Sequence, residues 1–185
     1  MIPVRIGLQQ RVLPIYRQPF FQALAAACPP NGLGIFAGEP RPNEMVENCL
    51  TVPGAQVTPA HNRHLFQGRW YLCWQSGLLH WLKTWQPEIL ILEANPRYLL
   101  SPLAVRWMHR HRRKVIGWGL GAPPTTPLRS IWRSLFLSQF DAMITYSQQG
   151  AQQYQAAGLP SRRIFIARNA IAPRPSNPPP ERPAV

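Results

Sequence analysis

Three polar side chains that could take part in chemistry follow one short apolar run. Glu93, Asn95 and Arg97 come just after the predicted strand from Glu88 to Leu92. Because a positioned carboxyl group can accept or donate a proton, Glu93 is the best single candidate for a catalytic acid or base. Its two neighbours could hydrogen-bond the hydroxyl groups of a substrate. The alternative is a polar turn that leads into the next helix.

Two further groups of candidate binding residues follow other predicted strands. Those after the first strand (Pro3 to Gly7) are Gly7, Tyr16 and Arg17, and those at the end of the strand from Val115 to Trp118 are Trp118, Gly119, Leu120 and Gly121. In doubly wound folds, ligands bind at the carboxyl ends of the strands. Glycines at such positions permit close approach of a substrate. The alternatives are a tight turn before a helix for the first group, and a loop with positive φ for the second.

A histidine pair gives a further candidate. His61 and His64 fall in a predicted loop after a weak strand near Ala55 to Val57. His61 could act as a general base or contact a substrate, the pair could bind a metal, or the loop could simply be solvated. Because no cysteine or carboxylate lies near the pair in sequence, no metal site is predicted. Asp141 is the only aspartate, which argues against chemistry that needs paired carboxylates.

Composition restricts the partners and the compartment. The 185 residues carry 20 Lys and Arg against 7 Asp and Glu, a net charge of +13, so an anionic partner is expected: nucleic acid, an anionic membrane or a phosphorylated substrate. The three cysteines lack metal or redox spacing and are expected to be free thiols in a reducing compartment. No secretory signal and no apolar stretch of roughly 20 residues is evident. A cytoplasmic protein is therefore expected.

Part of the positive charge is concentrated in one segment that ends a predicted helix and leads into a strand. Its basic residues are Arg106, Arg110, Arg112, Arg113 and Lys114. Arg106, Arg110 and Arg113 recur at helical spacing and would form one basic stripe. Two interpretations stay open: a solvated helix end stabilised by the helix dipole, or a site for anionic lipid head groups that would make the protein peripheral to the membrane.

Short apolar runs alternate with helical periodicity along the chain. The predicted strands are Pro3 to Gly7, Leu33 to Phe36, Ala55 to Val57, Glu88 to Leu92, Val115 to Trp118, Ala142 to Thr145 and Ile164 to Ala167. This alternation is typical of βαβ units. The expected fold class is α/β: a Rossmann-like, doubly wound, mostly parallel sheet of about seven strands.

Capping residues and aromatic spacing predict the helices. Ser101-Pro102 and Thr126-Pro127 each pair a capping hydroxyl with a first-turn proline. The second of these helices is amphipathic and is expected to lie on the sheet. A third predicted helix runs from Trp70 to Trp85 with an aromatic stripe that is expected to pack in the core. A fourth is capped by Ser147 and ends at Gly158.

The carboxyl-terminal residues change in composition. Residues 172–185 are rich in proline, which predicts an extended linker toward a further domain. Residues 1–171 are expected to form one folded domain. The sequence thus predicts a single Rossmann-like domain followed by a linker.

The order of several short motifs resembles the amino-terminal domain of GT-B glycosyltransferases of the family 4, or group 1, type. A strand that ends at Ser147, a helix that ends in Gly158-Leu159-Pro160 and a strand that ends in an Asn169 turn match that pattern. The segment from Trp85 to Glu93 resembles another strand of the family, and the segment from Tyr16 to Phe21 resembles the start of its first helix. Leu120 stands where the family often carries a histidine, and Gly7 where many relatives have a glycine pair.

The resemblance implies one half of an enzyme with two Rossmann-like domains. The intact enzyme would transfer a hexose from a nucleotide sugar to a glycan or lipid-linked acceptor, with retention of configuration. It would need neither a cofactor nor an obligatory metal, because the nucleotide sugar is a co-substrate. This chain would be the acceptor-side domain and would be inactive without the donor-binding half, supplied by a carboxyl-terminal domain or a partner subunit.

The resemblance also gives the candidate acceptor-binding set and leaves rivals open. That set is Gly7, Tyr16, Arg17, Glu93, Asn95, Arg97, Trp118, Gly119, Leu120, Gly121, Ser147 and Asn169. A basic module that binds nucleic acid or an anionic membrane without catalysis is the alternative, although no recognition helix or zinc spacing supports nucleic acid. A free-standing dehydrogenase is disfavoured because the first strand lacks a GxGxxG motif.

Overall fold

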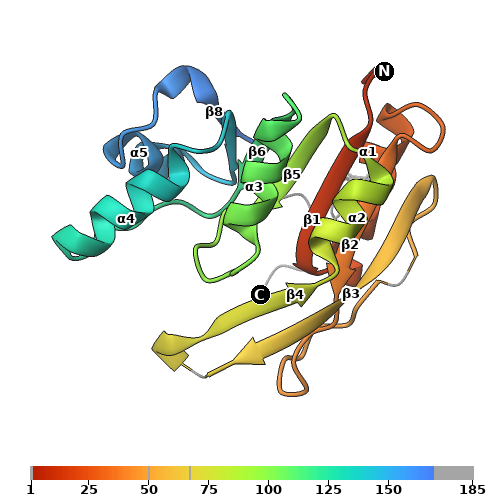
Figure 1. Ribbon diagram of the computed structural model, residues 1–185, viewed down its shortest axis with the longest axis horizontal. Helices are drawn as coiled ribbons and strands as arrows, with labels where there is room; N and C mark the ends of the chain where they lie inside the picture. Colours follow the sequence, from red (N-terminus) through yellow and green to blue (C-terminus); the bar gives the residue numbers. More distant parts are fainter. Residues whose placement is uncertain (1, 50, 67, 169–185) are drawn as a thin grey trace, which may run out of the picture.

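A computed structural model describes residues 2–49, 51–66 and 68–168, and over these residues eight strands form one mixed sheet (Figure 1). The strand order is β4-β3-β2-β1-β5-β6-β7-β8, and β4 alone runs antiparallel to its neighbour. The strands are β1 (Ile6–Val12), β2 (Leu33–Gly38), β3 (Ala55–Leu65), β4 (Leu72–Ser76), β5 (Ile89–Glu93), β6 (Lys114–Trp118), β7 (Ala142–Thr145) and β8 (Ile164–Ile166). This confirms the predicted α/β class, with one strand more than expected.

Helices cover both faces of the sheet. They are α1 (Gln18–Ala27), α2 (Leu78–Trp85), α3 (Ser101–Arg110), α4 (Pro127–Leu137) and α5 (Gln148–Ala156), with short 3-10 turns η1 (Ile15–Arg17), η2 (Gly68–Trp70) and η3 (Ser161–Arg163). Leu8 and Ile35 pack with Phe21 of α1 on one face. On the other face, Leu90 packs with residues of α2 and α3, including Leu82. Burial on both faces explains why the parallel strands read as continuous apolar runs.

The prediction of one helix from Trp70 to Trp85 is wrong for the first half of that segment. Trp70 ends η2, β4 follows, and Gly77 with φ +88° separates β4 from α2. Cys73 and Gln75 are buried while Trp74 between them is exposed, which is the two-residue alternation of a strand. The prediction was wrong here because the aromatic residues fit both the 3.6-residue period of a helix and the two-residue period of a strand. Trp81 and Trp85 in α2 are buried in the core, as predicted.

The first strand also lies further along the chain than predicted. It runs from Ile6 to Val12 rather than from Pro3 to Gly7. Gln9 and Gln10 are only 1% and 2% exposed, so two buried amides continue the strand where the sequence suggested a polar loop. β3 is likewise longer than predicted, with 11 residues, because its second half pairs with β4 as a hairpin that extends beyond the parallel sheet (Figure 1).

A chain of buried amides joins this hairpin to the centre of the sheet. Gln9 Nε2 donates to Gln75 Oε1 at 2.7 Å, and Gln75 Nε2 donates to the Gln10 carbonyl and to Asn62 Oδ1, each at 3.0 Å. Asn62 Nδ2 in turn donates to the Arg11 carbonyl at 2.7 Å. The other oxygen in the chain, Gln9 Oε1, accepts the Glu93 N–H at 3.1 Å. The network therefore connects β1, β3, β4 and the end of β5.

The helix ends agree with most of the predicted caps. Ser147 Oγ accepts the Gly150 N–H at 3.0 Å and caps α5, and Gly158 closes that helix with φ +98°. Thr126 occupies the cap of α4 without a side-chain hydrogen bond. Ser101 is the first helical residue of α3, and Leu100 before it is the cap. The predicted start of α3 was therefore off by one residue.

Helix α4 does not lie on the sheet with its apolar face, contrary to the prediction. Phe136 and Leu137 at its end are buried, but the apolar side chains before them are exposed by half or more: Leu128, Ile131, Trp132 and Leu135. Figure 1 shows α4 projecting at one edge of the molecule.

All three cysteines are buried free thiols, as predicted. Among the described residues, every helix is too short or too polar to cross a bilayer. The predicted linker 172–185 lies outside these residues.

Replacing Gln75 tests the amide network. We expect Gln75→Leu to lower the free energy of unfolding by about 2–4 kcal/mol, because the buried Gln9 Nε2 loses its acceptor and the Gln10 carbonyl loses the hydrogen bond from Gln75. Urea denaturation measures the change. The matched control is Gln56→Leu on β3, where the side chain is exposed and the change should stay within about 0.5 kcal/mol. Equal effects of the two substitutions would contradict the role given to the network.

An ion-pair cluster at the end of β1 predicts a pH effect. Arg11 and Arg41 both contact Glu44, each at 2.8 Å. Burial alone would raise the pKa of Glu44, but hydrogen bonds from the two arginines and the Arg11 charge lower it from 4.5 to about 2. A carboxyl whose pKa is lower in the folded than in the unfolded protein stabilises the fold above pH 4.5, and this contribution disappears as the pH falls toward 2.

We therefore expect Glu44→Gln to cost about 1–3 kcal/mol at pH 7 and progressively less between pH 5 and pH 2, relative to the natural chain. Urea unfolding at a series of pH values gives this difference directly. Glu47→Gln, an exposed carboxylate in the same loop, serves as the charge-matched control. A cost for Glu44→Gln that stays constant down to pH 2 would be inconsistent with the ion-pair cluster.

Candidate functional site

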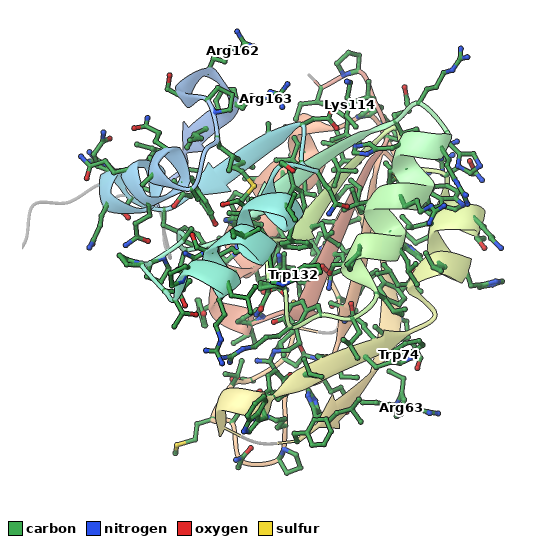
Figure 2. The ribbon with its side chains drawn as sticks, turned by 60° about the vertical axis from the view of Figure 1, so that its left-hand side comes forward. Arg63, Trp74, Lys114, Trp132, Arg162 and Arg163 are labelled. Atoms are coloured by element: carbon green, nitrogen blue, oxygen red, sulfur yellow. The ribbon has the colours of Figure 1, made fainter. Side chains whose placement is uncertain are left out.

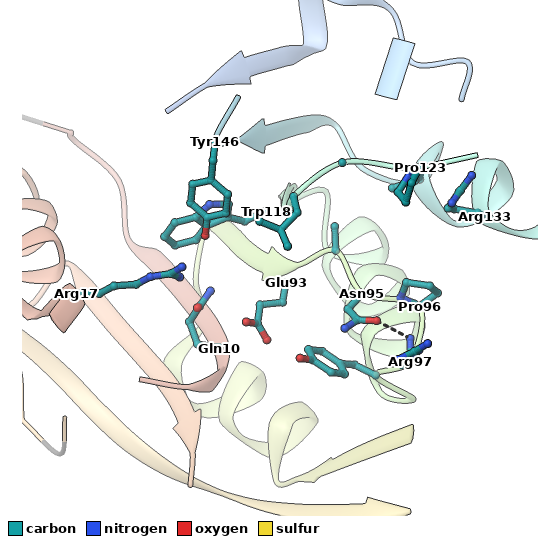
Figure 3. A pocket seen from close by; sticks show the side chains of 16 residues that line it. Gln10, Arg17, Glu93, Asn95, Pro96, Arg97, Trp118, Pro123, Arg133 and Tyr146 are labelled. Carbon is teal, nitrogen blue, oxygen red and sulfur yellow. Dashed lines mark hydrogen bonds between the residues drawn. The ribbon is translucent and has the colours of Figure 1, made fainter. Parts of the chain in front are cut away.

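A cleft of about 480 Å³ opens at the carboxyl ends of β1, β5, β6 and β7 (Figure 3). After β1 the chain builds outward through β2 and β3, and it returns to the other side of β1 with β5. The connections on the two sides of this switch point diverge, which leaves a crevice between the strand ends. The cleft is lined by Gln10, Arg17, Glu93, Ala94, Asn95, Pro96, Arg97, Tyr98, Trp118, Gly119, Leu120, Gly121, Pro123, Arg133, Leu137 and Tyr146.

Glu93, the last residue of β5, points into the middle of this cleft (Figure 3). Its Oε2 accepts the Arg11 N–H at 2.8 Å, and the Tyr98 hydroxyl donates to the same carboxylate. Burial raises the pKa of Glu93 above its ordinary value, against these hydrogen bonds and the charges of Arg11 and Arg17, which lower it. A carboxyl group with a raised pKa is suited to accept and return a proton near neutral pH.

Tyr98 keeps its proton beside Glu93. Burial, with the negative charge of Glu93 next in effect, raises the pKa of Tyr98 far above its ordinary value. The phenol is therefore a fixed hydrogen-bond donor to the carboxylate. With the Arg11 N–H on the same group, the orientation of the Glu93 side chain is set by both β1 and the loop after β5.

Arg17 forms the opposite wall of the cleft with Trp118 and Tyr146, and its guanidinium contacts three aromatic rings. Its guanidinium carbon lies 5.6 Å from the centroid of Tyr16, 5.7 Å from that of Trp118 and 5.4 Å from that of Tyr146. Such distances are in the range of cation–π attraction. Burial raises the pKa of Tyr146 above its ordinary value, although the charge of Arg17 and its hydrogen bond to Tyr146 act in the opposite direction. The aromatic rings hold Arg17 on the β1 side of Glu93.

The far wall consists of the loops after β5 and β6. Asn95 Oδ1 accepts the Arg97 N–H at 3.1 Å and so fixes a tight turn (Figure 3). After β6, Gly121 has φ +137°, a backbone conformation that residues other than glycine rarely adopt. Leu120 between the two glycines is 79% exposed. Both loops present polar groups and backbone to the same cleft.

The structure brings eight predicted site residues together in this cleft: Arg17, Glu93, Asn95, Arg97, Trp118, Gly119, Leu120 and Gly121. Tyr16 is exposed in η1 and contacts Arg17 without lining the cleft. Ser147 follows β7 and has its hydroxyl in the helix cap. Asn169 lies outside the described residues.

Three predicted positions are corrected. Gly7 is the second residue of β1 and pairs with Gly34 and Leu90, so it lies inside the sheet rather than in a loop at the carboxyl edge. His61 and His64 are not in a loop either, because they lie in β3 opposite Ser76 and Cys73. The extended lengths of β1 and β3 explain these differences.

The histidine pair borders a separate cavity of about 690 Å³ between the ends of β2 and β3. His64 Nδ1 lies 2.9 Å from the Tyr71 hydroxyl. Burial, together with the charges of Arg11 and Arg41, lowers the pKa of His64. Over the described part of the chain, no group of three metal-ligating side chains comes together. His61 lines this second cavity and not the Glu93 cleft.

Four polar residues of the cleft were not among the predicted site residues: Gln10, Tyr98, Arg133 and Tyr146. Gln10 was missed because β1 was ended too early. Tyr146 directly precedes Ser147 at a strand end, a position that could have indicated it. Arg133 reaches the cleft from α4, and no local pattern in the sequence reveals that approach.

The basic segment lies away from the cleft. Lys114 begins β6, and parallel strands begin at the edge opposite their carboxyl ends. Figure 2 shows Lys114 together with Arg162 and Arg163 toward one end of the molecule and Trp132 of α4 apart from them. Lys114 pairs with Asp141 at 2.9 Å. Arg106, Arg110 and Arg112 are exposed.

Arg113 does not belong to the helical stripe that was predicted. Helix α3 ends at Arg110, and Arg112 has φ +57°, which turns the chain before Arg113. The Arg113 guanidinium lies 5.1 Å from the Trp107 ring centroid and donates to Gln86. The stripe is therefore reduced to Arg106 and Arg110.

Comparisons with known proteins identify the fold but no family. No family model and no curated sequence matches the chain. A protein of Listeria monocytogenes assigned as a UDP-N-acetylglucosamine 2-epimerase superimposes with a TM-score of 0.57 at 10% identity, over 90% of this chain and 45% of that one. HepE of Anabaena, solved with UDP and glucose, gives 0.53 at 8% identity, over 90% and 44%.

A further UDP-N-acetylglucosamine 2-epimerase gives a TM-score of 0.50 at 9% identity, over 89% of this chain and 48% of that protein. This chain thus spans a little under half the length of each of these proteins. At such identities the likeness concerns the fold. The chain has the fold of one Rossmann-like half of a GT-B-type protein, as the sequence resemblance predicted.

Proposed function

We propose that this chain is the acceptor-side half of a glycosyltransferase that acts on nucleotide sugars. The observation that carries the proposal is the cleft at the switch point, where Glu93, a carboxyl with a raised pKa, lies among Asn95, Arg17 and Arg97. HepE, which has a similar fold, binds UDP and glucose. The finer assignment to family 4, with retention of configuration and hexose transfer, rests on the sequence motifs.

In this proposal Glu93 orients the attacking hydroxyl of the acceptor and accepts its proton. The acceptor oxygen bonds to the sugar carbon while the bond from that carbon to the nucleoside diphosphate breaks, releasing the diphosphate. Tyr98 and the Arg11 N–H occupy part of the carboxylate, which leaves its remaining lone pairs for the acceptor. Asn95 is positioned to hydrogen-bond neighbouring hydroxyl groups. The nucleotide sugar is a co-substrate bound mainly by the other half of the enzyme, and no resident cofactor is proposed. Positioning and charge stabilisation then supply the rate enhancement.

A second candidate is epimerisation of a nucleotide sugar without an acceptor. Two of the compared structures are assigned as UDP-N-acetylglucosamine 2-epimerases, and a carboxyl with a raised pKa also suits proton abstraction from carbon. Product analysis separates the two reactions, because only a transferase consumes an acceptor. A basic module that binds nucleic acid remains the non-catalytic rival, and it leaves the position of Glu93 in the cleft without a role.

The substitution Glu93→Gln tests the proposal in the protein expressed from its own gene. We expect the rate of sugar transfer from UDP-glucose or UDP-N-acetylglucosamine to fall by about 100-fold or more, because an amide cannot accept the proton. UDP affinity, measured by calorimetry, should stay within about twofold. Glu47→Gln, an exposed carboxylate outside the cleft, is the control. Unchanged transfer by Glu93→Gln would refute the assignment, and a 2-epimer formed without acceptor would favour the second candidate.

We further propose that the protein is peripheral to the cytoplasmic face of a membrane and contacts it through α4. Ile131 and Trp132 are 58% and 68% exposed, and both charged residues of the helix are arginines, Arg129 and Arg133. An exposed apolar stripe flanked by arginine suits an anionic lipid surface. Because Arg133 lines the cleft, α4 would bring a lipid-linked acceptor to Glu93. The basic segment lies at the opposite edge of the sheet and would not bring an acceptor to Glu93.

Vesicle binding tests the membrane proposal. We expect the double substitution Ile131→Ser with Trp132→Ser to reduce partitioning onto vesicles with one third phosphatidylserine by about tenfold or more, since two apolar side chains no longer insert. Phe165→Ser, which removes another exposed aromatic side chain, is the control. If Arg110→Gln with Arg112→Gln abolished binding and the α4 substitutions did not, the basic segment would be the membrane site instead.

A further inference from the structure

The candidate cleft carries more positive charge than its own carboxylate can balance. Three arginines line it, Arg17, Arg97 and Arg133, against the single acid Glu93. The ion pairs found among the described residues involve other groups, on Glu44 and Asp141. Cations gathered in a concave site attract anionic ligands because the surrounding protein focuses their field. The charge of the cleft therefore favours a ligand that is itself negative.

Buried donors without partners point in the same direction. Trp118 is only 7% exposed, and its Nε1–H has no hydrogen-bond partner among the described residues. The Nε atoms of Arg17 and Arg133 are also buried and unpartnered there. A buried donor without an acceptor destabilises the protein, because the donor has lost its hydrogen bonds to water. All three side chains line the same cleft. Arg17 and Trp118 lie next to each other on one side, whereas Arg133 is at the far side (Figure 3), so one bound anion could supply acceptors for Arg17 and Trp118.

Arg17 is the best placed of the three arginines to bind such a group. It is held among the rings of Tyr16, Trp118 and Tyr146, so its guanidinium has lost part of its freedom before any ligand arrives. Figure 3 shows Arg17 on one side of Glu93 and Asn95 with Arg97 on the other. A planar guanidinium binds phosphate and carboxylate oxygens in a bidentate manner.

We infer that the acceptor carries an anionic group, a phosphate monoester or a carboxylate, which binds Arg17 and the Trp118 N–H while the reacting hydroxyl lies at Glu93. This inference rests on the proposed function and specifies its acceptor class. The anion belongs to the acceptor, whereas the diphosphate of the donor is bound by the other half of the enzyme. A neutral sugar would leave the charge of the cleft without a counterpart.

Titration of the indole N–H signals by NMR tests the inference without catalysis. The probes are glucose 6-phosphate, glucuronate and glucose, added to the chain, with the Trp118 signal assigned by Trp118→Phe. We expect glucose 6-phosphate or glucuronate to shift this signal saturably and glucose to bind at least tenfold more weakly. The stronger of the two anions identifies the group as phosphate or carboxylate. Arg17→Gln should weaken anion binding by tenfold or more, and Arg162→Gln, exposed on η3, should not.

Three outcomes would overturn the inference: equal binding of glucose and the charged sugars, equal loss with Arg17→Gln and Arg162→Gln, or displacement of the charged sugar by UDP. The third would mean that the site takes the donor diphosphate. These outcomes differ from failure of the proposed function. Anion binding at Arg17 without any sugar transfer would contradict the proposed function and leave only an anion site. Transfer to neutral acceptors without anion binding would contradict the inference and leave the proposed function standing.

Discussion

The structure depends on a buried chain of amide hydrogen bonds that begins at Gln9. A parallel sheet of this kind usually fills its central strand with apolar side chains, yet β1 carries two adjacent buried glutamines. Gln9 binds Gln75 of β4 through its amide nitrogen and the Glu93 N–H through its oxygen. Because an unmet buried amide is costly, these partners fix the hairpin and the end of β5 relative to one another.

That constraint determines the chemistry of the cleft. β1 continues past Gln10 to Arg11, whose backbone N–H reaches the Glu93 carboxylate and whose side chain pairs with Glu44. Glu93 is thereby held in a buried position that raises its pKa, with Tyr98 as a protonated partner. Arg17 is positioned separately, by aromatic rings from η1, β6 and the end of β7. A carboxyl group with a raised pKa and an arginine held by aromatic rings thus face one crevice.

The sequence predicted the parts of this arrangement that follow from chain order. Apolar runs indicated the parallel strands, and side chains directly after them, such as Glu93, Asn95 and Gly121, proved to share a cleft because parallel strands end at one edge. The prediction failed where polar residues are buried in a strand, as at Gln9 and Gln10 in β1. The prediction also failed where aromatic residues fit two periodicities, as at Trp74 in β4, and where a side chain such as Arg133 reaches the cleft from a distant helix.

The most direct test of the account is a crystal structure of the protein from its own gene with UDP and a charged acceptor bound. The account predicts the acceptor in the cleft, with one hydroxyl about 3 Å from the Glu93 carboxylate, its anionic group on Arg17, and UDP facing it from the other half of the enzyme. An acceptor bound elsewhere, with this cleft filled by the UDP diphosphate, would contradict the assignment of the chain as the acceptor side.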